Sequence, residues 1–373
     1  MERWDTLIVG AGPAGCAAAY DLAAAGRTVL LLDKAEFPRP KACAGGLTRK
    51  SLRALRYSVA PIVRATVSAI VVESQRGEAA TLSSRSSICA MTVREELDAF
   101  CLEKTLAAGA QIRRIGTVTA VEESPEEVVV RTMEGSFRGC FLVGADGANS
   151  RIRQLVAGDG PVWFRRGFAL EAEVRRRDGS GSKLIFDLAP VGRGYGWIFP
   201  KGDHLNIGLY TASAEEKLHR QGLMAYIGER FADARAGNVT GQYLGFGAEE
   251  APPAQGRVFL AGDAGGFADP LTGEGIYGAI ASGQAAAAAI HSNLRGGPAA
   301  NIVFSALTAQ LRQDLRLSAS GARWFYANQG MGFRALTAPL FRGAVINAYA
   351  NGTKIAALAN AVRRFARAFA GSA

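Results

Sequence analysis

Residues 5–34 of the chain read D-T-L-I-V-G-A-G-P-A-G-C-A-A-A-Y-D-L-A-A-A-G-R-T-V-L-L-L-D-K. The short apolar run Thr6–Val9 predicts a buried parallel strand, and the alanine-rich segment Ala14–Ala25 predicts a helix. A second apolar run, Thr28–Leu32, predicts the next strand. Strand, G-x-G-x-x-G turn, helix and second strand in this order are typical of a dinucleotide-binding unit. The other interpretation is an ordinary β-α-β unit whose glycines serve packing alone.

Each glycine of this turn has a distinct task in a dinucleotide site. Gly10 allows a tight turn, Gly12 lets the main chain approach a pyrophosphate, and Gly15 lets helix and strand pack closely. The start of the helix offers free N–H groups and a positive dipole end to phosphates. Asp33 ends the second strand, where its carboxylate can accept a hydrogen bond from an adenosine ribose hydroxyl.

Composition narrows the class of protein. The 373 residues are 49% hydrophobic and 20% charged, which describes a globular chain of one large or two medium domains. The net charge of +10 suits an acidic cofactor or an anionic membrane surface, and no basic helix with interleaved aromatic residues points to nucleic acid. Five cysteines without C-x-x-C spacing indicate a reducing compartment, so we expect a cytoplasmic protein without a signal peptide. Three scattered histidines argue against a metal site.

A second glycine-rich turn follows another buried strand, Arg257–Ala261. It places Asp263 at the carboxyl end of that strand, where the carboxylate can accept from the polyol chain of a flavin. The loop Pro270–Gly275 then opens a helix over Tyr277–Leu294, whose dipole would favour negative charge on a reduced flavin. The other interpretation of this stretch is a simple strand-turn-helix unit in which the aspartate caps the helix. The two turns together predict FAD as the cofactor.

A third turn, Leu142–Arg153, reads L-V-G-A-D-G-A-N-S-R-I-R and also follows a predicted strand. Asp146 and Gly147 can support the pyrophosphate loop or contact the cofactor directly. Between this turn and Asp263, alternating strands from Phe168 to Leu244 predict an antiparallel sheet, followed by a helix at Glu215–Phe231. Apolar runs earlier in the chain predict further strands at Val67–Val72 and Ile112–Val121.

We therefore predict an α/β fold with a discontinuous Rossmann-like FAD-binding domain, an inserted antiparallel-sheet substrate domain and a helical C-terminal region. The predicted boundaries are residues 1–62, 88–160 and 251–295 for the FAD-binding domain, 63–87 and 161–250 for the substrate domain, and 296–373 for the C-terminal region.

The three turns, in this order, resemble those of the hydroxylase-like flavoproteins that contain FAD. Two further stretches resemble the geranylgeranyl reductase family: F-P-R-P-K-A-C-A-G-G-L at residues 37–47 and Y-G-W-I-F-P at residues 195–200. The resemblance covers about residues 5–295. The first stretch departs from the family pattern, since Ala44 stands between Cys43 and the glycine pair.

Tyr195, Trp197 and Phe199 alternate along a predicted strand and therefore share one of its faces. The pattern alone favours plain core packing of a sheet, whereas the resemblance implies an aromatic substrate wall. The resemblance also places the Cys43 loop near the flavin ring, where a thiol could relay a proton or gate the flavin. It implies Cys43, Tyr195 and Trp197 as catalytic residues and Phe199, Pro200 and Gly208 as pocket residues.

Arg39 and Arg94 are candidate partners of the phosphates or the ribityl chain, or else solvated surface arginines. The full set of predicted cofactor-binding residues is Gly10, Gly12, Pro13, Ala14, Gly15, Asp33, Lys34, Arg39, Ala44, Gly45, Arg94, Asp263, Gly273, Gly275 and Ile276.

The resemblance implies an FAD-dependent reductase of carbon–carbon double bonds in a prenyl or other lipid-like substrate. Its electrons would come from NAD(P)H or an electron-transfer protein. Two alternatives use the same scaffold: an FAD monooxygenase or halogenase, and a flavin- or lipid-binding module without catalysis. A basic amphipathic helix predicted over residues 354–369 either docks on the core of the protein or contacts an anionic membrane peripherally.

Overall fold

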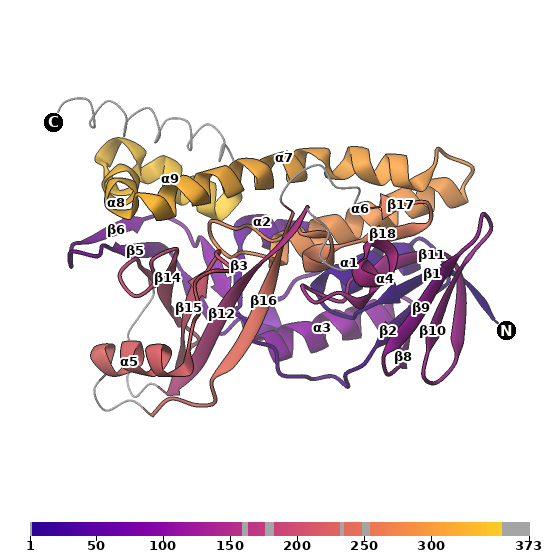
Figure 1. The fold of residues 1–373 in the computed structure, drawn as a ribbon, viewed down its shortest axis with the longest axis horizontal. Coiled ribbons are helices and arrows are strands. Elements are labelled where there is room, and N and C mark those ends of the chain that lie inside the picture. Colours follow the sequence, from indigo (N-terminus) through magenta and orange to yellow (C-terminus); the bar gives the residue numbers. More distant parts are fainter. Residues whose placement is uncertain (1, 159–162, 176–182, 232–234, 248–253, 353–373) are drawn as a thin grey trace.

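The computed structural model describes residues 2–158, 163–175, 183–231, 235–247 and 254–352. Figure 1 shows two large sheets side by side, with the long helix α7 running along both of them toward α8 and α9. The architecture is therefore the predicted mixed α/β fold with a helical C-terminal region.

The first sheet has eight strands and a parallel centre in the order β18-β11-β1-β2-β8, with β17 at one edge. A hairpin, β9–β10, pairs antiparallel with the first half of β11. The carboxyl ends of its parallel strands meet at one edge, which is where α/β folds bind ligands. The strands are β1 (Arg3–Val9), β2 (Val29–Asp33), β8 (Gln111–Arg114), β9 (Val118–Glu123), β10 (Val128–Thr132), β11 (Ser136–Gly144), β17 (Ala254–Gln255) and β18 (Val258–Leu260).

Alternating side chains of this sheet build two separate cores. Ile8, Leu31 and Val143 face helices α1 (Pro13–Ala24), α3 (Arg94–Ala107) and α6 (Ile276–Leu294). Their neighbours Leu7, Leu30 and Leu142 face the other way and pack with the β9–β10 hairpin and α4 (Arg151–Ala157).

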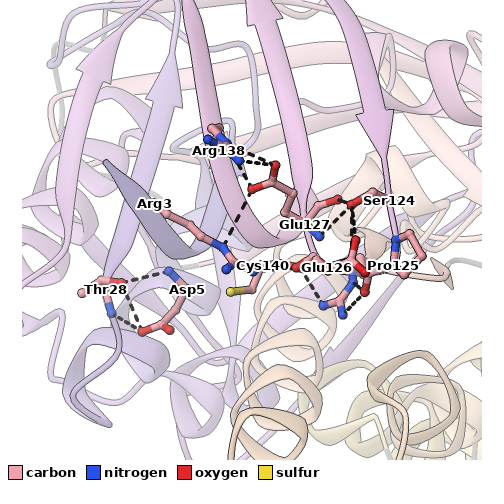
Figure 2. Close-up of polar contacts among 10 residues, drawn as sticks. Arg3, Asp5, Thr28, Ser124, Pro125, Glu126, Glu127, Arg138 and Cys140 are labelled. Carbon is pink, nitrogen blue, oxygen red and sulfur yellow. Dashed lines mark hydrogen bonds and ion pairs between the residues drawn. The ribbon is translucent and has the colours of Figure 1, made fainter. Parts of the chain in front are cut away.

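Three arginines fasten the β9–β10 hairpin to the sheet (Figure 2). Arg3 donates to the main-chain oxygen of Glu126 (2.6 Å), and Arg138 pairs with the carboxylate of Glu127 (2.6 Å). Arg257 donates to the main-chain oxygen of Pro125 (2.7 Å). These contacts tie the turn of the hairpin, residues 124–127, to β1, to β11 and to the residue before β18.

The second sheet has seven strands in the order β16-β12-β15-β14-β13-β5-β6. It is antiparallel, as predicted, except that β5 and β13 pair in parallel, because the β5–β6 hairpin comes from an earlier part of the chain and adds at the edge. The strands are β5 (Ala69–Glu73), β6 (Ala79–Ser83), β12 (Phe164–Arg175), β13 (Lys183–Asp187), β14 (Gly194–Pro200), β15 (His204–Thr211) and β16 (Thr240–Gly247).

Short elements and helices complete the described chain. A three-stranded sheet links the two larger ones. Its strands are β3 (Gly46–Thr48), β4 (Ala65–Val67) and β7 (Cys89–Met91). The remaining helices are α2 (Arg49–Ala54), α5 (Arg220–Arg230), α7 (Ala300–Ala327), α8 (Gln329–Thr337), α9 (Pro339–Asn351) and the 3₁₀ turns η1 (Ala60–Ile62) and η2 (Gly262–Gly265).

Three predicted elements differ in extent. The strand predicted near residues 112–121 is broken into β8 and β9, and that predicted over 67–72 is broken at Ser68. The helix predicted from Glu215 begins only at Arg220, because the carboxylate of Glu216 accepts from the N–H groups of Gly192 and Arg193 instead of facing solvent on a helix. The helix predicted over 354–369 lies outside the described residues. Within the described ranges, no helix combines the length and apolar character needed to cross a bilayer.

Candidate functional site

A cavity of about 1700 Å³ lies between the carboxyl edge of the eight-stranded sheet and the seven-stranded sheet. Residues far apart in the sequence meet on its wall. The predicted site residues that line it are Gly10, Gly12, Pro13, Ala14, Asp33, Lys34, Arg39, Cys43, Ala44, Gly45, Arg94, Tyr195, Trp197, Phe199, Asp263, Gly273, Gly275 and Ile276.

The other three predicted residues, Gly15, Pro200 and Gly208, lie behind this wall. A Cβ on Gly15 would stand 1.8 Å from the main-chain oxygen of Gly10, so Gly15 serves the contact between helix and strand. A Cβ on Gly208 would stand 2.2 Å from the indole of Trp197, so Gly208 makes room for that ring instead of contacting a ligand. Pro200 is buried as the last residue of β14.

The first glycine turn leaves one side open to the cavity. Gly10 has φ +102°, and a Cβ there would stand 2.4 Å from the main-chain oxygen of Ala145 in the third turn. Gly12 is the N-cap of α1 and has only the tip of Arg39 near its missing Cβ, at 3.7 Å. The main chain at the start of α1 is thus exposed for the close approach of a pyrophosphate.

Three aspartates hold the loops around this opening. Asp33 accepts from the N–H of Ala11 (2.6 Å), and its carboxylate oxygens keep lone pairs for a ribose hydroxyl. Asp146 accepts from the N–H groups of Arg151 (2.7 Å) and Ile152 (3.1 Å) at the start of α4, and it also lines the cavity. Asp263 faces the cavity and accepts from the N–H of Gly245 (3.1 Å); burial raises its pKa above the ordinary value.

These observations fit FAD. The cavity offers an open glycine turn, a helix N-terminus, a carboxylate at the end of β2 and a second carboxylate after β18. A dinucleotide with a polyol chain requires that combination of partners. The residues that would hold it include Gly12, Ala14, Asp33 and Asp263.

The Cys43 loop borders this space. The thiol of Cys43 accepts from the N–H of Gly45 (3.3 Å). Beneath the loop, the buried carboxylate of Asp98 pairs with Arg94 (2.9 Å) and with Arg39 (3.1 Å). Burial opposes the charge of Arg94, but Asp98 and Cys43 raise the pKa of its guanidinium above the ordinary value. Both arginines are therefore fixed at the cavity wall rather than solvated at the surface.

Lys41 is a further cavity residue of this loop. Its ammonium group donates to the side-chain oxygen of Gln242 on β16. Burial, together with repulsion from Arg94, lowers the pKa of Lys41 to about 8. The cavity therefore holds a lysine that loses its proton more readily than an exposed lysine does.

The aromatic side chains of β14 form one wall. The ring centroids of Tyr195 and Trp197 lie 6.3 Å apart, and Phe186 on β13 lies 5.2 Å from both Tyr195 and Phe199. All four line the cavity. This wall gives one part of the cavity an apolar lining.

Three tyrosine hydroxyl groups tie this wall to the loop before α6. Tyr195 donates to the main-chain oxygen of Thr272, Tyr210 to that of Pro270 (2.8 Å), and Tyr326 to that of Leu271. Three consecutive carbonyls are thus held by side chains from β14, β15 and α7. The hydroxyl of Tyr195 is engaged in this contact, so the residue presents its ring to the cavity.

The family comparison agrees with this geometry. A family model described as an FAD binding domain matches residues 3–161. A menaquinone reductase of Mycolicibacterium smegmatis is 31% identical, over 76% of this chain and 76% of its own. A geranylgeranyl diphosphate reductase of Rhodobacter capsulatus is 29% identical, over 80% of this chain and 78% of its own. The chain belongs to the geranylgeranyl reductase family of FAD-dependent oxidoreductases.

Solved structures show the same fold. A geranylgeranyl bacteriochlorophyll reductase-like protein of Thermoplasma acidophilum superposes with a TM-score of 0.80 at 20% identity, over 96% of this chain and 99% of that one. A flavin-dependent brominase superposes with a TM-score of 0.77 at 19% identity, over 98% and 100%. FAD is thus the cofactor of this family member, while the shared scaffold alone does not select the chemistry.

Four residues around the site were not among the predicted site residues. Asp98, Glu171, Lys201 and Asn206 are all buried and all bond to predicted site residues or their loops. Lys201 and Asn206 stand close to the Y-G-W-I-F-P stretch, so their sequence positions offered a hint. Asp98 and Glu171 stand in no motif, and only the fold brings them to the Cys43 loop.

Proposed function

We propose that this protein reduces carbon–carbon double bonds in a prenyl or other lipid-like chain. The observation that supports this most is the joining of an apolar aromatic wall and a flavin cradle in one cavity. Such a cavity can hold an apolar chain against the flavin and keep water away from it. The names of the relatives, which are reductases of prenyl compounds and of a quinone, agree with an apolar substrate.

An isolated alkene carries no electron-withdrawing group, so a proton must arrive with or before the hydride that reduced FAD supplies when bound. Positive charge then develops on carbon. The rings of Trp197 and Tyr195 at the cavity wall would stabilise that charge by about 1–2 kcal/mol, more where water is excluded. Cys43 would hold the proton at Sγ, where the N–H of Gly45 orients the sulfur.

We expect Trp197→Leu to lower kcat about tenfold, because the stabilisation of positive charge is lost, and Cys43→Ala to lower kcat about a hundredfold. Both variants should retain FAD, since neither side chain belongs to the glycine turns. Cys140→Ala is the matched control, because Cys140 is half-buried on β11 and does not line the cavity. Mass spectrometry of the product measures turnover. Unchanged turnover in both variants would remove these residues from the mechanism.

The alternative chemistry is oxygenation or halogenation, and the similarity of fold to a brominase keeps it as a second candidate. A halogenase needs a positioned lysine, and Lys41 is the lysine near the motifs whose ammonium reaches the cavity side chain Gln242. Product mass separates the reactions, because a reductase adds two hydrogen atoms, whereas the alternatives add oxygen or halogen. A bound flavin that supports neither reaction would indicate a binding module.

We also propose that a nicotinamide or an electron-transfer protein supplies the electrons and that an anionic membrane surface is a peripheral partner. Residues 296–373 contain eight arginines and one lysine against one aspartate, which is +8 of the total +10. The protein should therefore sediment with vesicles rich in anionic lipid, and this should weaken as salt screens the attraction. Equal binding to neutral vesicles, or none to either kind, would rule out this partner.

A further inference from the structure

Lys201 is a buried lysine that the proposed mechanism leaves unused. It follows β14 directly and is 2% exposed. Its ammonium group donates to two main-chain oxygens, those of Ala44 and Thr92 (2.6 Å to Thr92). Burial lowers its pKa to about 8, against the attraction of Cys43 and Glu171. A lysine is seldom buried among neutral carbonyls, because desolvating its charge is costly.

Glu171 contacts the same loop with the opposite charge. It projects from β12, lines the cavity and accepts from the N–H of Cys43 (2.8 Å). The side chain of Asn206 also hydrogen-bonds to this carboxyl group. Asn206 in turn accepts from the indole N–H of Trp197 (2.7 Å). Since an indole N–H only donates, the amide oxygen of Asn206 faces Trp197 and its NH₂ group faces Glu171.

The loop is therefore held at two consecutive residues by side chains of the seven-stranded sheet and of the residue that follows β14. The carboxylate of Glu171 accepts from the N–H of Cys43, and the ammonium group of Lys201 donates to the carbonyl oxygen of Ala44. Gly45 has φ +62°, and a Cβ on it would stand 2.1 Å from the oxygen of Thr92 and 2.4 Å from the ammonium nitrogen of Lys201. Thr92 and Lys201 therefore pack directly against Gly45, which also lines the cavity.

We propose that Glu171 and Lys201 are positioning residues that fix the Cys43 loop and set the Cys43 thiol relative to the indole of Trp197. Glu171 connects to both groups, directly to Cys43 and through Asn206 to Trp197. These two residues thus join a loop of the FAD-binding part to the seven-stranded sheet. An effect of these residues on catalysis rests on the proposed function, whereas their restraint of the Cys43 loop does not.

Hydrogen exchange of the FAD-loaded protein, followed by mass spectrometry, tests whether Glu171 and Lys201 restrain the Cys43 loop. In Glu171→Leu and Lys201→Met, exchange in a peptide covering Cys43–Gly45 should rise about tenfold, because a hydrogen bond to a charged group is lost. Peptides from β1 and α1 should exchange as before. Glu171→Gln should be intermediate, since its amide oxygen still accepts. Glu229→Leu and Lys183→Met, both at exposed positions, are the controls.

Unchanged exchange at the loop in Glu171→Leu would overturn the proposal, and so would an equal rise across the whole chain. Glu171→Gln keeps the test available if the apolar variants fail to fold. Where double-bond reduction is measurable, the variants should lower kcat with KM and FAD content retained. If the protein proves not to reduce alkenes, the exchange result still decides whether the loop is held in this way.

Discussion

Gly15→Ala is expected to abolish FAD retention and to lower the free energy of unfolding by at least about 3 kcal/mol. The added Cβ would stand 1.8 Å from the main-chain oxygen of Gly10 and 3.0 Å from its carbonyl carbon. Neither partner is a flexible side chain, so α1 must move away from β1. The start of α1 and the glycine turn would then separate at the point where a pyrophosphate binds.

The flavin-to-protein absorbance ratio and thermal unfolding measure this effect. Gly222→Ala is the matched control, because Gly222 lies in helix α5 and nothing stands within 4 Å of its missing Cβ. That substitution should leave FAD content unchanged and raise stability by up to about 1 kcal/mol, since alanine is the better helix former. Normal FAD content in Gly15→Ala would contradict the close-packing account.

Asp98→Ala should lower the free energy of unfolding by about 3–5 kcal/mol, because it leaves the buried guanidinium group of Arg94 and the partly buried one of Arg39 without their carboxylate. Asp98 is 1% exposed and pairs with both Arg94 and Arg39. The two arginines line the cavity, so FAD content should fall as well. Chemical denaturation with a parallel flavin measurement gives both quantities.

Glu96→Ala is the control on the same helix. Glu96 pairs with Arg64, but both side chains are substantially exposed, and an exposed pair contributes less than about 1 kcal/mol. A loss at Asp98 no larger than that at Glu96 would mean that the buried carboxylate is dispensable. Asp98→Asn should lie between the two, since it keeps the shape of the side chain without the charge.

The cofactor half of the fold could be predicted because each element carries a local signal. The strand-glycine-helix pattern of residues 6–25 depends on residues close in sequence, and the structure has β1 and α1 there. The carboxylates of Asp33 and Asp263 end predicted strands, so parallel pairing alone brings them to one edge.

The partners of the Cys43 loop could not be predicted in the same way. Glu171 is 128 positions from Cys43, and its place on the cavity wall depends on how the inserted sheet docks on the FAD-binding part. In the sequence, Asp98 is one of several acidic residues of an amphipathic helix. Its pairing with Arg39 depends on a separate loop that only the fold brings close. The helix predicted from Glu215 was wrong at its start for the same reason, which is a contact between residues distant in sequence. The carboxylate of Glu216 accepts hydrogen bonds from the N–H groups of residues 192 and 193.

Anaerobic reoxidation of the reduced flavin tests the proposed function most directly. The FAD-loaded protein is reduced with dithionite, mixed with geranylgeranyl diphosphate or a short polyprenyl lipid, and followed by flavin absorbance and product mass. Prenyl reduction predicts that the flavin reoxidises without oxygen and that the product gains two hydrogen atoms per turnover. A flavin that stays reduced until air is admitted, with oxygen or halogen then appearing in the product, would contradict it.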